Sequence, residues 1–335
     1  MPRLILLACL LLGLLPHSPA NGQDAERFYA GKRITYLVQG EPGTGYDLYA
    51  RLIATYMERY LPRTRIRIRN EIMGGGGILM ANSVATMAGD GLAMATLNAG
   101  LIYSQLQELD GIRFDLRELT WIGKAGADPR VLYTGNGSGI TSMEALLAAP
   151  TPVLIATVAG VGTSSYTDAV LIASALGLDA RMVIFANSGE ANMSLLRGEV
   201  PLRIGSLSSA QRFVDSSGGH LLAGVGRSPI LPAGLPDTYD YAVDSQGARI
   251  MELMEAVSAF VRFTVMPPGV PPERVALIRA AYGAALRDPE LLAEAAQLGL
   301  PIDFMEAEPL QERINQVLTQ PQSMIDLLKS TLGTR

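Results

Sequence analysis

Two glycine-rich turns, each between a short apolar run and a helical pattern, most constrain how this chain can fold. The first, residues 40–47, follows the β-branched and aromatic run 34–38 and precedes apolar residues at helical spacing. The second, residues 157–165, follows the apolar run 153–156 and also precedes a helical pattern. Both segments are therefore predicted to be strand-to-helix turns of an α/β fold.

Such turns are suited to holding an anion. Glycine lets the backbone approach a ligand closely, and the first amides of a helix have no acceptor within the helix. Two of these turns facing each other would form an anion clamp. The alternative is ordinary turn chemistry, because neither turn, nor the glycine run 74–77, has the spacing of a nucleotide-binding loop. The anion hypothesis depends on the pair of turns.

The N-terminus has the pattern of a secretory signal. One positive charge in residues 1–3 precedes a twelve-residue apolar stretch, and small residues end at Ala20. We expect a signal peptide over residues 1–20. A lipid-acceptor role for Cys9 is the alternative, although this cysteine comes very early in the stretch. No later apolar run approaches the roughly 20 residues of a membrane-spanning helix, so we expect an exported, soluble protein.

The counts of cysteine and histidine limit the catalytic and metal-binding chemistry that the chain can carry. Cys9 is the only cysteine, and His17 and His220 are the only histidines. Once the signal is removed, no thiol remains and His220 lies in a glycine-serine turn, which argues against serine-histidine catalysis, histidine-rich zinc sites and disulfides. No cofactor or metal motif is present. The formal net charge is −5, and the alternating arginines of residues 63–69 fit a solvated strand face better than a phosphate site.

The length of the mature chain, roughly 315 residues, favours two domains. Strand and helix patterns alternate in the first hundred residues, which predicts a parallel sheet whose strand ends gather the turns with Thr44, Gly75 and Asn98. A second α/β series follows residue 140. Residues 119–134 and 258–265 are predicted to be long extended passages, and the chain is predicted to cross between the two domains near residues 125–130 and 250–258. The helical tail, which ends in a single predicted helix from Leu310 to about Leu328, is predicted to return to the first sheet.

Several segments, in register, resemble the periplasmic solute receptors of tripartite tricarboxylate transporters, the Bug-type binding proteins. They are the turn and helix start 42–51, Asn70 with the glycine cluster and residues 89–91, the loop 159–164, residues 196–200, and the proline-rich stretches 227–236 and 267–271. The resemblance covers nearly the whole mature chain.

This resemblance implies a two-lobed Venus flytrap of the α/β class, with a mostly parallel sheet flanked by helices in each lobe and two crossover strands. We expect lobe 1 to comprise residues 21–128 and 256–335, and lobe 2 residues 129–255. The implied protein is a periplasmic monomer that binds a small carboxylate and delivers it to membrane permease subunits. It carries no catalytic residues and no cofactor.

The turns, the strand ends and the resemblance together give a set of expected ligand-binding residues. The resemblance implies that one ligand carboxylate is held by amides of the first turn and by hydroxyls and amides of the second. The set is Gly43, Thr44, Gly45, Tyr46, Asp47, Asn98, Thr157, Gly160, Val161, Gly162, Thr163, Ser164, Asn187 and Ser206. Capping of helix amides is an alternative role for Asp47.

The sequence departs from the family pattern at three places. Thr44 replaces one glycine of a pair, Ser206 stands where an aspartate is frequent, and residues 185–189 replace a Pro-Tyr-Lys-Gly motif. These positions leave the identity of the acid open.

Two other classes of function remain open. An exported enzyme could use Asp47, Tyr46 or Glu71 as acid or base, although no histidine or carboxylate pair is placed for that chemistry. A sensor for a membrane signalling partner is the other alternative.

Overall fold

The computed structural model describes residues 20–71, 77–126 and 128–333 of the 335-residue chain. The expected signal sequence before Ala20, with Cys9 and His17, lies outside the described residues, as does most of the glycine run 74–77. Among the described residues, no helix has the length and apolar character needed to cross a bilayer.

The first sheet has six strands in the order β11-β4-β10-β3-β1-β2. The pairs β1–β2 and β1–β3 are parallel, as the alternating pattern predicts, whereas β10 and β11 pair antiparallel to their neighbours. The strands are β1 (Arg33–Gln39), β2 (Arg65–Glu71), β3 (Ala93–Leu97), β4 (Thr120–Gly126), β10 (Phe263–Met266) and β11 (Ile302–Glu306). The helices of this part are α1 (Ala20–Tyr29), α2 (Gly45–Tyr60), α3 (Ile78–Thr86), α4 (Gly100–Leu106), α10 (Pro272–Arg287), α11 (Pro289–Gln297) and α12 (Ala307–Leu318).

The second sheet has five strands in the order β7-β6-β8-β5-β9. β6 runs parallel to β7 and β8, and β5 runs antiparallel to β8 and β9. The strands are β5 (Arg130–Thr134), β6 (Val153–Val158), β7 (Ala180–Phe185), β8 (Leu202–Ser206) and β9 (His220–Gly224). The helices are α5 (Met143–Leu147), α6 (Ser164–Ala175), α7 (Ser188–Leu196), α8 (Leu207–Ser217) and α9 (Ser245–Ser258), with short 3₁₀ helices at Asn136–Ser138 and Thr238–Tyr241.

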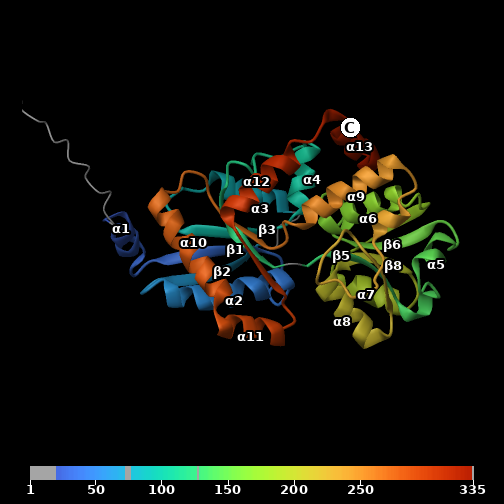
Figure 1. Ribbon diagram of the computed structural model, residues 1–335, viewed down its shortest axis with the longest axis horizontal. Helices are drawn as coiled ribbons and strands as arrows, with labels where there is room; N and C mark the ends of the chain where they lie inside the picture. Colours follow the sequence, from blue (N-terminus) through green and yellow to red (C-terminus); the bar gives the residue numbers. More distant parts are fainter. Residues whose placement is uncertain (1–19, 72–76, 127, 334–335) are drawn as a thin grey trace, which may run out of the picture.

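The two sheets form two lobes that lie side by side (Figure 1). This confirms the predicted two-lobed α/β fold. Both sheets are mixed, because β10 and β11 in the first sheet and β5 in the second run against the parallel series. The chain leaves the first sheet after β4 and returns to it at β10. Both glycine-rich turns lie at carboxyl ends of strands, after β1 and after β6.

Two segments differ from the sequence-based prediction. The extended strand predicted from residue 258 is only β10, because α9 continues to Ser258 with Ile250, Met251, Leu253, Met254 and Val257 buried along one helical face. The single helix predicted near the C-terminus is two helices, α12 and α13 (Gln322–Leu332), separated at Pro321. α13 lies against α6 of the second lobe and not on the first sheet, as Figure 1 also shows.

The apolar core explains why one side between the lobes is closed. A continuous cluster of buried side chains includes Leu101, Trp121 and Phe263 of the first lobe together with Ile172 and Val257 of the second. The other faces of the two sheets have separate cores, one under α2 and α10 and one under α7 and α8. The lobes are therefore joined on the α4–α6–α9 side, which leaves the opposite side for a cleft.

Trp121, the only tryptophan, is central to the shared core. Its ring stacks on Phe263 with centroids 4.8 Å apart, and its Nε1 donates a hydrogen bond to the carbonyl of Leu116 at 2.8 Å. We expect Trp121→Ala to lower the free energy of unfolding by about 3 to 5 kcal/mol, measured by urea denaturation followed by circular dichroism. Trp121→Phe should cost less, since it keeps the stacked ring. Equal losses would contradict this assignment.

Candidate functional site

The first glycine-rich turn is held in shape by the buried carboxylate of Asp47. One oxygen, Oδ2, accepts hydrogen bonds from the backbone N of Gly43 and from Nε of Arg51, both at 2.8 Å. The other, Oδ1, accepts from Nδ2 of Asn70 at 2.9 Å. Burial disfavours the ionised carboxylate, but these hydrogen bonds outweigh it and hold the pKa of Asp47 below its ordinary value. Asp47 thus fixes Gly43, which precedes the helix, and does not take the helix-capping role that the sequence left open.

The two turns differ in whether a threonine side chain caps the first amides of the following helix. At the start of α2, the hydroxyl of the N-cap residue Thr44 donates to the carbonyl of Glu41 at 2.8 Å and makes no cap bond to the helix. At the start of α6, the hydroxyl of Thr163 accepts from the backbone N of Tyr166 at 3.3 Å. The side chain of Thr44 therefore leaves the first amides of α2 open to an anion, with the positive end of the helix dipole behind them.

A buried arginine stands beside the first turn. Arg262 directly precedes β10 and has a left-handed backbone, with φ of 58°. Its guanidinium lies 4.1 Å from the ring centroid of Tyr46, and a Cβ atom at Gly45 would come within 2.9 Å of its Nη2. Glycine at position 45 thus lets the guanidinium approach the helix start closely.

Arg262 joins the first turn to the second lobe through Asp128. Its Nη2 lies 3.1 Å from Oδ2 of Asp128, and both residues are buried. The same carboxylate accepts from the backbone N of Ser208 at 2.9 Å and from the Ser208 hydroxyl at 2.8 Å. Ser208 belongs to the first turn of α8, two residues after Ser206. The pair therefore connects the start of α2 to the start of α8.

Two further arginines, the partly buried Arg130 of β5 and the buried Arg203 of β8, lie on the second sheet. Nε of Arg130 is 2.6 Å from Oδ2 of the buried Asp168. Burial disfavours the charged form of Arg130, but Asp168 and Asp128 outweigh it and raise its pKa. Arg203 donates to the carbonyl and hydroxyl of Ser188, and its charge lies near that of Arg130. Burial is the main cause that lowers the pKa of Arg203.

Arg262 pairs with Asp128 and Arg130 pairs with Asp168, whereas Arg203 has Ser188 as its hydrogen-bonding partner and lies near the charge of Arg130. Among these five groups, the buried charge of Arg203 is the one without an acidic partner. A buried cation of this kind favours an anion as the ligand.

The second turn meets the first lobe at Asn98. Oδ1 of Asn98 accepts from the hydroxyl of Ser164 at 3.2 Å and from the backbone N of Gly100 at 2.8 Å. Nδ2 of Asn98 donates to Oε1 of Gln39, the residue before the first turn. A Cβ atom at Gly100 would lie 2.6 Å from Oγ of Ser164, so this contact needs the glycine. The two turns are therefore joined through Gln39, Asn98 and Ser164.

The structure places the expected ligand-binding residues in three groups. Gly45 and Tyr46 contact Arg262, and Ser206 contacts Ser208 and Ser209 beside Asp128. Asn98 and Ser164 form the contact just described, with Gly43, Thr44, Gly160, Val161, Gly162 and Thr163 in the adjoining turns. Two of the expected residues, Thr157 and Asn187, make hydrogen bonds within the second lobe instead. Thr157 is fully buried, with its hydroxyl toward the carbonyl of Val183, and Asn187 caps α7 by accepting from the backbone N of Glu190.

Sequence reasoning missed Arg262, Asp128 and Ser208, which connect the starts of α2 and α8, and Arg130, which pairs with Asp168. One signal was present: Asp128 and Arg130 flank Pro129 in a predicted connection between the lobes, and Arg262 is a lone cation within the apolar run 259–265. Charged residues in otherwise apolar connecting segments indicate buried ion pairs.

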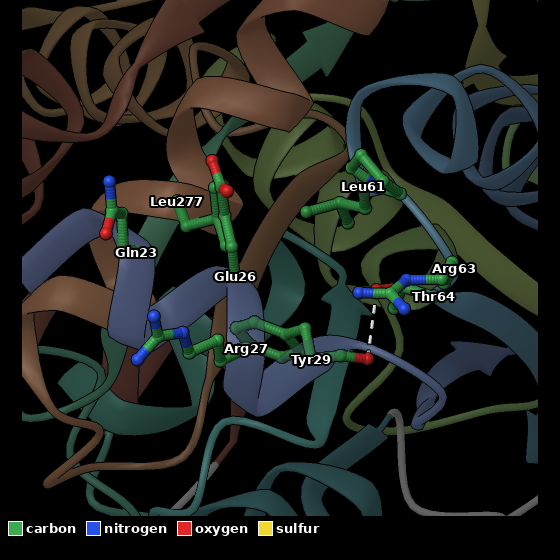
Figure 2. Close-up of a pocket in the computed structure, with 9 residues that line it drawn as sticks. Gln23, Glu26, Arg27, Tyr29, Leu61, Arg63, Thr64 and Leu277 are labelled. Carbon is green, nitrogen blue, oxygen red and sulfur yellow. Dashed lines mark hydrogen bonds between the residues drawn. The ribbon is translucent and has the colours of Figure 1, made fainter.

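A different pocket, shown in Figure 2, has no part in this arrangement. It has a volume of about 300 Å³ and is lined by Gln23, Glu26, Arg27 and Tyr29 of α1 or its end, with Leu61, Pro62, Arg63, Thr64 and Leu277. Figure 1 places α1 at the far end of the first lobe from the second lobe. We assign no function to it.

Comparisons with known proteins agree with the fold. A family model described as "Tripartite tricarboxylate transporter family receptor" matches residues 49–329. A Pseudomonas sp. (strain P51) protein, "UPF0065 protein in tcbD-tcbE intergenic region", is 24% identical over 298 residues, which cover 87% of this chain and 85% of that protein.

Solved structures are similar over most of the chain. The periplasmic binding protein BugD superposes with a TM-score of 0.71 at 19% identity, covering 90% of this chain and 98% of BugD. MatC from Rhodopseudomonas palustris with bound malate gives 0.67 at 20% identity, covering 90% and 99%. An R. palustris protein with adipate gives 0.70 at 19% identity, covering 90% and 97%.

The Arg262–Asp128 pair generates a stability prediction. Arg262→Met should lower the free energy of unfolding by about 3 kcal/mol, because it leaves the buried Asp128 without its cation. Adding Asp128→Asn to that variant should recover part of the loss, and urea denaturation of both single variants and the double variant measures the coupling. Strictly additive losses would show that the two side chains are independent.

The contribution of the first turn to the free energy of unfolding should depend on pH through the ionisation of Asp47. Because the folded-state pKa of Asp47 lies below its ordinary value of 3.8, its ionised form stabilises the protein above that pH, and the contribution is lost as the pH falls through the folded-state pKa. Asp47→Asn should therefore be less stable than the natural protein at pH 7, and the difference in free energy of unfolding should shrink below about pH 4. A difference that stays constant down to pH 2 would contradict this role.

Proposed function

Because this chain belongs to the family of tripartite tricarboxylate transporter receptors, we propose that it is an extracytoplasmic solute-binding protein that captures a small carboxylate between its lobes. We further propose that it delivers this ligand to the permease subunits of a tripartite tricarboxylate-type transporter. The lobes in this proposal are residues 21–128 with 256–335, and residues 129–255. Cleavage of an N-terminal signal after Ala20 and a monomeric state belong to the same proposal.

The single observation that carries the proposal is the joining of the two turns across the lobes. The uncapped start of α2, the guanidinium of Arg262 and the contact between Asn98 and Ser164 lie on one connected set of residues. A carboxylate held there would accept hydrogen bonds from open helix amides and would lie close to the guanidinium of Arg262. The neighbours solved with malate and with adipate are consistent with a carboxylate ligand.

Binding by both lobes gives the ligand a way to favour the closed protein. A ligand shifts an equilibrium between open and closed states by its difference in affinity for the two. Contacts with α2 of one lobe and with the 160–164 turn of the other exist together only when the lobes are close. We therefore propose hinge closure at the connections between β4 and β5 and between α9 and β10, without a chemical step on the ligand.

The proposal is tested by binding of mono-, di- and tricarboxylates, first by thermal shift and then by titration calorimetry. Thr163→Ala should raise the dissociation constant for the best acid on the order of tenfold, because it removes a hydrogen-bonding group that orders the second turn. Ser142→Ala is the matched control, since Ser142 likewise accepts from a helix amide in lobe 2, at the start of α5.

Both variants should lose similar stability through the missing N-cap, but only Thr163→Ala should lose affinity. Recovery of the acid unchanged after long incubation would support a receptor, whereas conversion of the acid would identify an enzyme. If no acid raises the melting temperature, or if the two variants bind equally well, the proposed site is wrong.

A further inference from the structure

An apolar groove runs between the lobes beside the candidate anion site. It has a volume of about 730 Å³ and is formed by α8 and the loop at residues 230–232 on one side, and by α11 and the start of β11 on the other. Figure 1 shows α8 and α11 facing each other across the side on which the lobes do not share a core. The volume falls within the range typical of small-molecule sites, which are frequent at domain interfaces.

The lining of this groove is chemically uneven. Leu207 and Ile230 come from the second lobe, and Leu292, Ala296 and Ile302 from the first. The polar lining residues Ser208, Gln211, Arg212 and Asp215 all belong to α8. Leu292 remains 41% exposed. Covering such a groove with a hydrocarbon group removes apolar surface from water, which favours binding of that group.

Two contacts place the groove next to the anion site. Ser208, which lines the groove, donates to Asp128, the partner of Arg262. Pro301, also in the lining, accepts at its carbonyl a 2.7 Å hydrogen bond from the hydroxyl of Tyr49. The ring centroid of Tyr49 lies 5.1 Å from the guanidinium of Arg262. Arg262 is thus one residue away from the groove lining along both routes, and it also touches Gly45 at the start of α2.

We propose that this groove is a second subsite that takes the hydrocarbon body of the ligand. The ligand class is an organic acid with one carboxylate at the open start of α2 and an apolar chain or ring extending past Arg262 between α8 and α11. This inference rests on the proposed function, because the carboxylate end is held at the site described above. The uncharged lining that the first lobe contributes disfavours short, highly polar acids as the best ligands.

The test is a series of straight-chain monocarboxylates from butyrate to decanoate, titrated by calorimetry. Each methylene buried in the groove should tighten binding about three- to fourfold, so octanoate should bind on the order of a hundredfold more tightly than butyrate. Octanamide should bind at least tenfold more weakly than octanoate, because it lacks the charge.

A matched pair of variants on α11 locates the effect. Ala296→Trp fills the groove and should abolish most of the difference between octanoate and butyrate. Ala293→Trp places the same bulk at an exposed position of the same helix that does not line the groove, and it should preserve the difference. Circular dichroism verifies that both variants fold.

The outcomes separate this inference from the proposed function. If no carboxylate binds, both are wrong. If carboxylates bind but affinity is flat across the series, or if the two variants behave alike, only the groove assignment is wrong. Equal binding of octanamide and octanoate would show that the groove does not share its ligand with the anion site.

Discussion

The buried ion pair between Arg262 and Asp128 is the interaction on which the arrangement between the lobes depends. Asp128 lies in the connection between β4 and β5, and Arg262 lies in the return to β10. One carboxylate thereby fixes the start of α8, and one guanidinium fixes the position of Tyr46 and the close approach to Gly45. Since a buried pair gains little net stability once desolvation is included, its main effect is positional. It sets the starts of two helices, one from each lobe, relative to each other.

The two sides of the molecule are built for different purposes. On one side, α4, α6, α9 and α12 bury a single apolar cluster that runs through both lobes, and α13 extends the first-lobe tail onto α6. On the other side, the cores under α2 and under α8 are separate. Relative motion of the lobes is therefore resisted on the shared side. The open start of α2 and the apolar groove lie on the other side, where the two cores are separate.

Much of the fold could be predicted from the sequence because it is encoded locally. The apolar runs 34–38 and 153–156, each followed by glycines and a helical pattern, correctly predicted the strand-to-helix turns after β1 and β6. Where local patterns were ambiguous, prediction failed: the alternation near residue 260 suggested a long strand, but the helical burial of Ile250, Met254 and Val257 carries α9 through Ser258.

Local sequence patterns give much less information about which distant residues are in contact in the folded chain. Asp128 and Arg262 are far apart in the sequence, and neither has a motif that identifies its partner. The site prediction was therefore limited to residues within the glycine-rich turns. The turn sequence and the family resemblance that suggested Thr157 and Asn187 do not reveal that Asn187 caps α7 or that the hydroxyl of Thr157 points toward β7. Residues that depend on tertiary contacts, such as Ser208, require the folded chain.

The left-handed backbone of Arg262 limits how this protein could be stabilised by mutation. Glycine is the residue that adopts such a conformation without steric cost, whereas a residue with a side chain gives up about 1 to 2 kcal/mol there. Glycine at 262 would relax the main chain and, in the same step, remove the cation that connects the two lobes. Backbone relaxation and charge placement are thus in conflict at this position, and a search for thermostable variants that scores only main-chain geometry would remove the Arg262–Asp128 pair.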